Sequence, residues 1–202
     1  MSGTNVPKGE ARREAILRAT LAVIGEHGAD AVTHRAVAAA AGLPLSATTY
    51  WFSSRDELLE ESLRLAAREE VERLERLVVN LAPRDLSIAE WAAAVAAELA
   101  GDLALDRGRH VALAELALEA GRRPRLRDEV ERWHTAHLRL AELGLRAAGS
   151  EEPESDAPIV VAAISGFVLA QLSLPDAAFE QKVLRPGLER LFSRLVAEAA
   201  TV

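Results

Sequence analysis

The sequence predicts an all-α protein of about nine helices, and three observations support this class. Half of the 202 residues are hydrophobic, but only 4% are aromatic, and Ala and Leu dominate. Apolar residues recur every three or four positions along most of the chain, which is the period of an amphipathic helix. Runs of β-branched residues, which favour strands, are scarce. A chain of this length can bury a sizeable core in one or two compact units.

The first helix is expected over about residues 10–27. Apolar residues from Ile16 to Ile24 lie at helical spacing within it, and Gly28 can end it. This helix is expected to pack across the next two and so complete a three-helix head.

A helix, a tight turn and a second helix are expected after Asp30. Thr33 can cap the first of these helices, and the alanine-rich run that follows strongly favours helix. Gly42 can adopt the left-handed conformation that ends a helix, and Pro44 suits the first turn of the second helix, over residues 44–51. Ser53 and Ser54 can then cap a further helix that starts near Arg55. This order is typical of a helix-turn-helix.

No acidic residue lies between Asp30 and Asp56, although the chain carries 31 acidic residues and a net charge of -7. A surface without carboxylates is what an element facing a polyanion needs. The second helix adds hydroxyl and aromatic side chains, which can reach phosphates and base edges from the major groove. These features predict a DNA-binding surface; the alternative is a small alanine-rich hairpin that serves only as core.

The remaining helices are placed by apolar spacing and by Pro and Gly breaks. We expect them, in chain order, over about residues 55–80, 87–105, 109–120, 125–148, 158–172 and 177–199. Residues 149–158 read as a polar loop. Pro186 and Gly187 should kink or restart the last helix.

The segment AVTHRAVAAAAGLPLSATTYWFSSRDELL, residues 31–59, closely resembles the DNA-binding segment of TetR-type transcriptional regulators. The shared pattern is a capping Thr, a small-residue helix, Ala-Gly-Leu, a short helix with hydroxyls and aromatics, Phe, and a capped Arg-Asp-x-Leu. The resemblance covers about the first 60 residues. It implies a DNA-binding domain over residues 1–54 and a ligand-binding and dimerisation domain over residues 55–202.

The resemblance and the side-chain chemistry together nominate residues for DNA contact. The nominated set is Thr33, Arg35, Ser46, Thr48, Thr49, Tyr50, Trp51 and Arg55. Within it, phosphate contacts are expected from Thr33, Tyr50, Trp51 and Arg55. Base-edge contacts are expected from Ser46 and Thr48.

The helix expected over residues 158–172 is apolar almost all round. We consider it too short and too interrupted to cross a membrane, and the N-terminus does not resemble a signal peptide, so a soluble cytoplasmic protein is predicted. A helix of this kind must be covered on every side. With the last helix it is expected to form a homodimer, whose two heads would read a palindromic double-stranded DNA operator. The alternative is an internal core helix of a monomer.

The resemblance also implies a pocket for a small-molecule effector in the body. The candidate lining residues are Trp91, His110, Trp133, His134, His137, Phe167 and Gln171. His134 and His137 lie three residues apart on nearly one helix face, but a metal site would need further ligands. We therefore expect hydrogen bonding to an effector or another helix, with no metal and no cofactor.

Enzyme chemistry finds little support in the sequence. The chain has no cysteine, no glycine-rich phosphate loop and no serine nucleophile elbow, and the Glu69–Glu70 pair is expected on a solvated helix. We predict a transcriptional repressor released from its operator by an effector that has unequal affinity for two conformations. Two alternatives remain: a regulator of the same fold that responds to a protein partner or to nothing, without a small-molecule effector, and a helical binding or enzymatic module that does not contact DNA.

Overall fold

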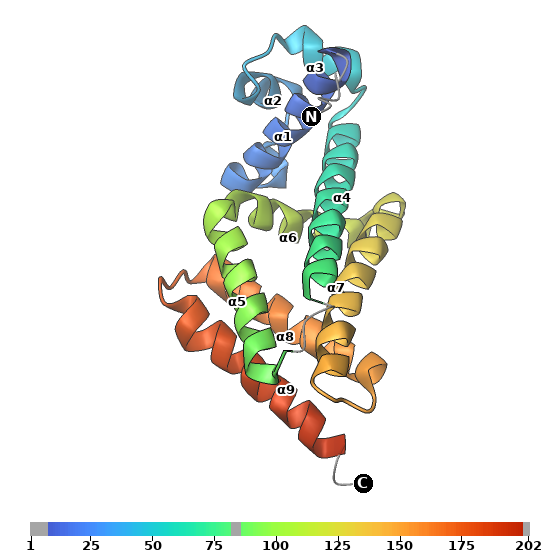
Figure 1. Cartoon of the computed structure of the whole chain (residues 1–202). Coiled ribbons are helices and arrows are strands. Elements are labelled where there is room, and N and C mark those ends of the chain that lie inside the picture. The colour runs from blue at the N-terminus through green and yellow to red at the C-terminus, as the bar shows by residue number, and fades with distance from the viewer. Residues whose placement is uncertain (1–7, 82–85, 200–202) are drawn as a thin grey trace, which may run out of the picture. The chain divides into compact units, whose positions relative to one another are not determined.

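The computed structural model describes residues 8–81 and 86–199, and these contain nine α-helices and no strand (Figure 1). The predicted all-α class is confirmed. By packing, the chain divides into two compact units. The head unit comprises the residues up to Arg68 together with Gly108–Val130, and the body unit comprises Glu69–Arg107 and the residues from Glu131 onward. The boundary between residues 54 and 55 is a division by function and stays a prediction.

The head unit is built around a small apolar core. Its helices are α1 (Lys8–His27), α2 (His34–Ala40), α3 (Leu45–Trp51), the first part of α4 (Arg55–Leu81) and nearly all of α6 (Arg107–Arg122). A 3-10 turn, η1 (Ala29–Ala31), joins α1 to α2, and α2 packs against both α1 and α3 (Figure 1). Ile16, Ile24, Phe52 and Leu58 are fully buried in this core.

The predicted caps in the head unit are confirmed. The Thr33 hydroxyl accepts a hydrogen bond from the Ala36 backbone N–H at 3.1 Å. The Ser54 hydroxyl accepts one from the Glu57 backbone N–H at 3.1 Å, and Glu57 in turn accepts from Ser53. These bonds satisfy N–H groups that have no partner within a helix. Helices α2 and α4 therefore start directly after their capping residues, Thr33 and Ser54.

The turn between α2 and α3 depends on a glycine. Gly42 has φ 63°, the left-handed conformation that the sequence predicted there. Helix α3 starts at Leu45, one residue later than predicted. Pro44 is its N-cap and not its first residue, with extended backbone at ψ 147°.

The body unit holds the second part of α4 and most of the later helices. These are α5 (Ile88–Leu105), the larger part of α7 (Arg127–Ala147), α8 (Pro153–Ser173) and α9 (Arg185–Ala199). Within this unit α9 packs against α5 and α8 (Figure 1). The irregularity expected near Pro186 is present, since a π-helical segment, Glu180–Leu184, directly precedes α9.

Helix α8 is longer than predicted. It begins at Pro153, so Pro158 lies inside the helix and most of the expected loop is helical. Pro153 takes the first helical position, where a missing N–H costs nothing. With 21 residues, α8 is long and apolar enough to cross a membrane by length and composition, which corrects the expectation that it is too short. One such helix is weak support for a membrane span, because helices of soluble proteins pass the same test.

Trp91 is central to the packing of the body unit. Its side chain is 3% exposed, and its ring lies 4.9 Å from that of Phe192. A Cβ placed on Gly144 of α7 would lie 2.3 Å from the Trp91 indole. The absence of a side chain at Gly144 therefore lets α5 and α7 approach around this ring.

We expect Gly144→Ala to lower the free energy of unfolding by about 1–3 kcal/mol, because the new methyl group would displace a buried indole. Gly101→Ala is the matched control: Gly101 is also helical, and a Cβ there would meet nothing within 4 Å. The control should be neutral or stabilising by up to about 1 kcal/mol. Urea unfolding measures both, and equal stability of the two variants would contradict this account of the packing.

Candidate functional site

The nominated DNA-contact residues lie on α2, on α3, at the N-cap of α2 or, for Arg55, at the start of α4. Five of them are exposed: Thr33, Arg35, Ser46, Thr49 and Tyr50. Tyr50 is the most accessible aromatic residue, with 80% of its surface exposed. Its ring meets that of Trp51 edge-on at 5.2 Å, and Trp51 is half-buried near Gly9 of α1. Hydroxyl, phenol and guanidinium groups therefore lie on the exposed surface of α2 and α3.

Thr48 does not belong to this exposed surface, contrary to the prediction of a base contact. Its side chain is fully buried, and its hydroxyl donates to the Leu45 carbonyl at 2.9 Å. A second carbonyl, that of His34, lies 3.4 Å away. Thr48 therefore lies on the inner face of α3, where it joins α3 to α2.

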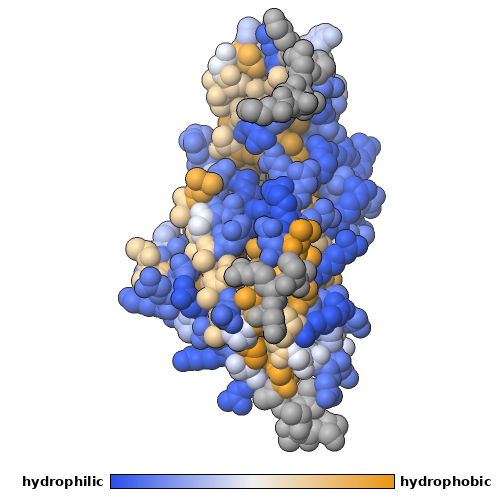
Figure 2. Space-filling model, viewed as in Figure 1, coloured by the Kyte–Doolittle hydropathy of each residue, from blue (hydrophilic) through white to orange (hydrophobic). Residues whose placement is uncertain are grey.

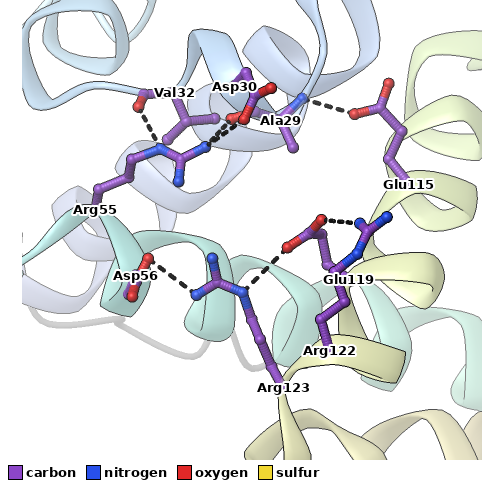
Figure 3. A network of polar contacts seen from close by, with 9 residues as sticks. All are labelled: Ala29, Asp30, Val32, Arg55, Asp56, Glu115, Glu119, Arg122 and Arg123. Atoms are coloured by element: carbon purple, nitrogen blue, oxygen red, sulfur yellow. Dashed lines mark hydrogen bonds and ion pairs between the residues drawn. The ribbon is translucent and has the colours of Figure 1, made fainter.

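Arg55 points back into the head unit and holds the turn before α2 (Figure 3). Its Nε donates to the Val32 carbonyl at 3.1 Å, and its Nη2 donates to the Ala29 carbonyl at 2.8 Å. An ion pair with Asp30 at 3.3 Å completes the arrangement. We therefore assign Arg55 to positioning this turn, instead of to the phosphate contact predicted from the sequence.

An ion-pair cluster that the sequence analysis missed supports the end of α3. Arg13 of α1 lies over the Phe52 ring, 5.3 Å from its centroid, and pairs with Glu61 of α4. Burial raises the pKa of Glu61, but hydrogen bonds from Arg13 and Arg64 outweigh it and leave the pKa below its ordinary value. Glu61 is therefore ionised at neutral pH. The basic residue at the start of the first helix was the available signal, but its acidic partner lies 48 residues away.

The candidate effector residues of the body do not form one group. Trp91 is core, His134 is exposed, and His110 is buried in α6, within the head unit. Phe167 of α8 packs where a Cβ on Gly187 would fall, 2.6 Å from its ring.

Trp133 and His137 do come together, one helical turn apart on α7. Their rings lie 5.7 Å apart, and the His137 Nδ1–H donates to the Trp133 carbonyl at 3.0 Å. Burial lowers the pKa of His137, so the ring is neutral at pH 7. Its Nε2 lies 3.8 Å from a Glu70 oxygen. The indole N–H of Trp133 is buried without an acceptor among the described residues.

Glu70 is part of a buried charge cluster, which corrects the expectation of a solvated helix there. Its side chain is 4% exposed and pairs with Arg73 at 2.7 Å. Arg73 also lies 3.5 Å from Asp102 of α5. Burial lowers the pKa of Arg73, but the hydrogen bond with Glu70 and the neighbouring carboxylates outweigh burial. The pKa of Arg73 therefore lies above its ordinary value. The pair is therefore held ionised inside the body unit, because each charge has an opposite partner.

A cavity of about 460 Å³ opens in the body unit between α5, the end of α8 and the segment that follows it. Gln171 is the one nominated effector residue that lines it. Its amide brackets Asp176: Nε2 donates to the Asp176 carbonyl at 3.1 Å, and Oε1 accepts from its N–H at 3.0 Å. Small residues of α5, including Ala100 and Gly101, line the same cavity. The polar residues of the cavity, Gln171 and Asp176, thus lie beside a wall formed by the small residues of α5.

Residues 8–81 and 86–199 contain no group of three or more His, Asp or Glu side chains placed to hold a metal ion. The sequence contains no cysteine.

An exposed helix-turn-helix on a helical body defines the class of the protein as a DNA-binding transcriptional regulator. Two family profiles agree with this class: bacterial regulatory proteins of the tetR family over residues 16–62, and the tetracyclin repressor-like C-terminal domain over residues 86–198. The chain belongs to the TetR family of transcriptional regulators. Membership points to a non-enzymatic protein.

Individual relatives match the chain over different lengths. The regulator PksA of Bacillus subtilis (strain 168) is 36% identical over 77 residues, and the match spans only 38% of each chain. The multidrug binding protein EbrR, solved with ethidium, is 30% identical, with a TM-score of 0.64 over 93% of this chain and 99% of EbrR. A TetR-family member from Streptomyces coelicolor A3 is 32% identical, with a TM-score of 0.66 over 92% of this chain and 98% of that one.

We expect Thr48→Val to leave the preference among operator variants unchanged while lowering the free energy of unfolding by about 1 kcal/mol, through loss of one buried hydrogen bond. Ser46→Ala, on the exposed side of the same helix, should change the preference among operator variants and leave the free energy of unfolding unchanged. Fluorescence anisotropy with operator variants, together with urea unfolding, measures both effects. A changed base preference in the Thr48 variant would restore it as a contact residue.

Proposed function

We propose that this chain is a cytoplasmic repressor that binds a palindromic DNA operator as a homodimer and is released by a small-molecule effector. TetR regulators bind DNA operators, typically as homodimers, and are soluble proteins. The observation that carries the proposal is the exposed face of α2 and α3, which has no carboxylate between Asp30 and Asp56 in a chain of net charge -7. Phosphate oxygens can approach this face without repulsion from like charges.

Helix α3 is the proposed recognition helix. Ser46 and Thr49 are short and exposed, which suits contact with base edges in a major groove. Tyr50 and Arg35 are exposed and longer, which suits phosphate contacts at the groove edges. Thr33, the N-cap of α2, and Trp51, the last residue of α3, are proposed for the same contacts. Thr48 and Arg55 hold these elements in place from within.

The proposed dimer forms through α8 and α9. Helix α8 carries an exposed row of apolar and small residues at helical spacing, the α8 stripe: Ile159, Ala162, Gly166, Leu169 and Ala170. Only 22% of the apolar window of this helix is buried within the chain. Hydrophobic residues are also visible over the body unit among hydrophilic ones in Figure 2. A second copy of α8 and α9 would cover the stripe as a four-helix bundle, and small residues would permit close packing.

We expect Leu169→Glu to convert the protein to monomers at micromolar concentration, because the variant places a charge in the apolar interface. Operator affinity should fall with it, since two heads are needed to engage both half-sites. Val79→Glu, on α4, is the control, because Val79 is also exposed, at 70% against 59% for Leu169.

Light scattering gives the mass, and anisotropy against DNA from upstream of the protein's own gene, over a salt series, gives the affinity. A monomeric wild type would refute the dimer. Wild-type binding no stronger to this DNA than to scrambled DNA would argue against the proposed repressor, and an absence of binding at low salt would favour a module that does not contact DNA.

The effector is proposed to bind in the cavity beside Gln171. Its volume of about 460 Å³ lies within the range of roughly 300–1,000 Å³ that is usual for small-molecule sites. The alanine and glycine side of α5 offers a flat wall for a planar ring. Two acidic residues, Asp176 and Glu180, line the cavity with one basic residue, Arg107, and Glu180 also pairs with Arg185. A planar organic cation suits these features. EbrR, a relative of the same family, binds ethidium, which has this chemistry.

We expect ethidium to bind the protein alone, with increased fluorescence, and Ala100→Phe to weaken that binding by about tenfold or more by filling the cavity. Ala89→Phe is the control, because Ala89 is exposed at the other end of α5 and does not line the cavity. The titration is done without DNA, because ethidium also binds DNA. Equal affinities in both variants would remove the cavity as the site, and no binding by the wild type would favour a regulator without this kind of effector.

A further inference from the structure

The turn between α1 and α2, from Gly28 to Val32, fixes the direction in which α2 and then α3 leave α1. Its 3-10 segment has only three residues, and Gly28 before it has φ 83°. Such a short turn has backbone groups that its own hydrogen bonds do not satisfy. Side chains from distant parts of the head unit bind the Ala29 N–H and the Val32 carbonyl, and one of them also bonds to the Ala29 carbonyl, which already accepts from the Val32 N–H (Figure 3).

Two side chains approach the turn from different helices. Arg55 of α4 donates to the carbonyls of Ala29 and Val32, as described above. Glu115 of α6 accepts from the Ala29 backbone N–H at 2.6 Å, across 86 positions of sequence. All three bonds involve a charged partner, which makes them stronger than neutral hydrogen bonds. Ala29 is therefore held at its N–H by α6 and at its carbonyl by α4.

Helix α6 is also in direct backbone contact with α1. A Cβ on Gly25 would lie 2.3 Å from the Gly108 carbonyl oxygen, so only glycine fits there. Farther along α6, a groove of about 330 Å³ separates it from the turn, and Glu115 lines that groove with Gly28 and Ala29. The bond from Glu115 therefore ties the turn to α6 where the backbones no longer touch.

The residue that follows α6 makes a second connection, to the first turn of α4. Arg123 pairs with Asp56 at 2.9 Å and with Glu119 at 3.2 Å (Figure 3). The hydrogen bond with Asp56 raises the pKa of Arg123, and that with Arg123 lowers the pKa of Glu119. Asp56 directly follows Arg55, so the residues that hold the turn from α4 and from α6 belong to one network.

We propose that Glu115 and Arg123 are positioning residues, which fix the α1–α2 turn and the start of α4 and thereby set the orientation in which α2 and α3 meet DNA. The proposal rests on the proposed DNA-binding function. The chain enters the head unit at Gly108 and leaves it at Val130. A change in the body unit can therefore act on the turn through α6, in addition to the direct route along α4.

The test compares Glu115→Ala with Glu115→Gln and Arg122→Ala. The alanine variant removes the acceptor for the Ala29 N–H, whereas glutamine retains an oxygen that can accept it. Arg122 is the matched control: it is on the same helix and pairs with Glu119, but its side chain is 74% exposed, and no described bond joins it to the turn. Arg123→Met tests the second connection in the same way.

We call the hold of Glu115 and Arg55 on the α1–α2 turn the clamp. Hydrogen–deuterium exchange of the free protein, measured on peptides covering residues 28–33, reports the clamp without DNA. Exchange should rise in Glu115→Ala and stay at the wild-type level in Arg122→Ala. Operator affinity should fall about tenfold in Glu115→Ala and Arg123→Met, with affinity for scrambled DNA nearly unchanged and with recovery in Glu115→Gln.

Unchanged exchange in Glu115→Ala would overturn the clamp, whether or not the protein binds an operator. Raised exchange with wild-type operator affinity would overturn the positioning role. An equal loss of affinity for operator and scrambled DNA, accompanied by a lowered melting temperature, would assign Glu115 to stability alone. If the wild type binds no operator, the proposed function fails, and the exchange result still decides the clamp.

Discussion

Two helices of seven residues cannot hold their shape in water alone, and this constraint governs the head unit. Their stability comes from what surrounds them: the Thr33 cap at the start of α2, Thr48 buried between α2 and α3, and Phe52 under the Arg13 side chain. These contacts face inward. Ser46 and Tyr50 lie on the other side of α3 and are exposed.

The same constraint explains why charged residues matter so much in this small unit. A short turn and short helices leave many backbone groups unpaired, and the core is too small to shield them. Arg55 and Glu115 bond to those groups directly, and Arg123 ties the helices that carry them. The energy of each exposed pair is small, so their role is better understood as geometry than as stability.

The body unit solves a different problem. Its long helices are stable against one another through buried rings such as Trp91, and it retains a buried ion pair, Glu70 with Arg73, beside the neutral ring of His137. A buried ion pair adds little net stability compared with apolar packing. The apolar surface that the unit leaves exposed on α8, and the cavity beside Gln171, are the features that its own packing does not use.

Local chemistry was sufficient to predict the class, the helix-turn-helix and the caps at Thr33 and Ser54, because apolar period, capping hydroxyls and Gly42 act within a few residues. The same pattern nominated the residues of the proposed DNA surface, five of which are exposed. Which face of α3 turns inward depends on its neighbours, so only the tertiary structure showed that Thr48 is buried and Arg55 bonded to a turn. Likewise, the local sequence predicts Glu70 on the surface, but α5 and α7 cover it in the folded protein. It also predicts a helix start at Pro158, whereas α8 starts at Pro153. The contact between Glu115 and Ala29 spans 86 positions, and no local pattern encodes a contact of that range.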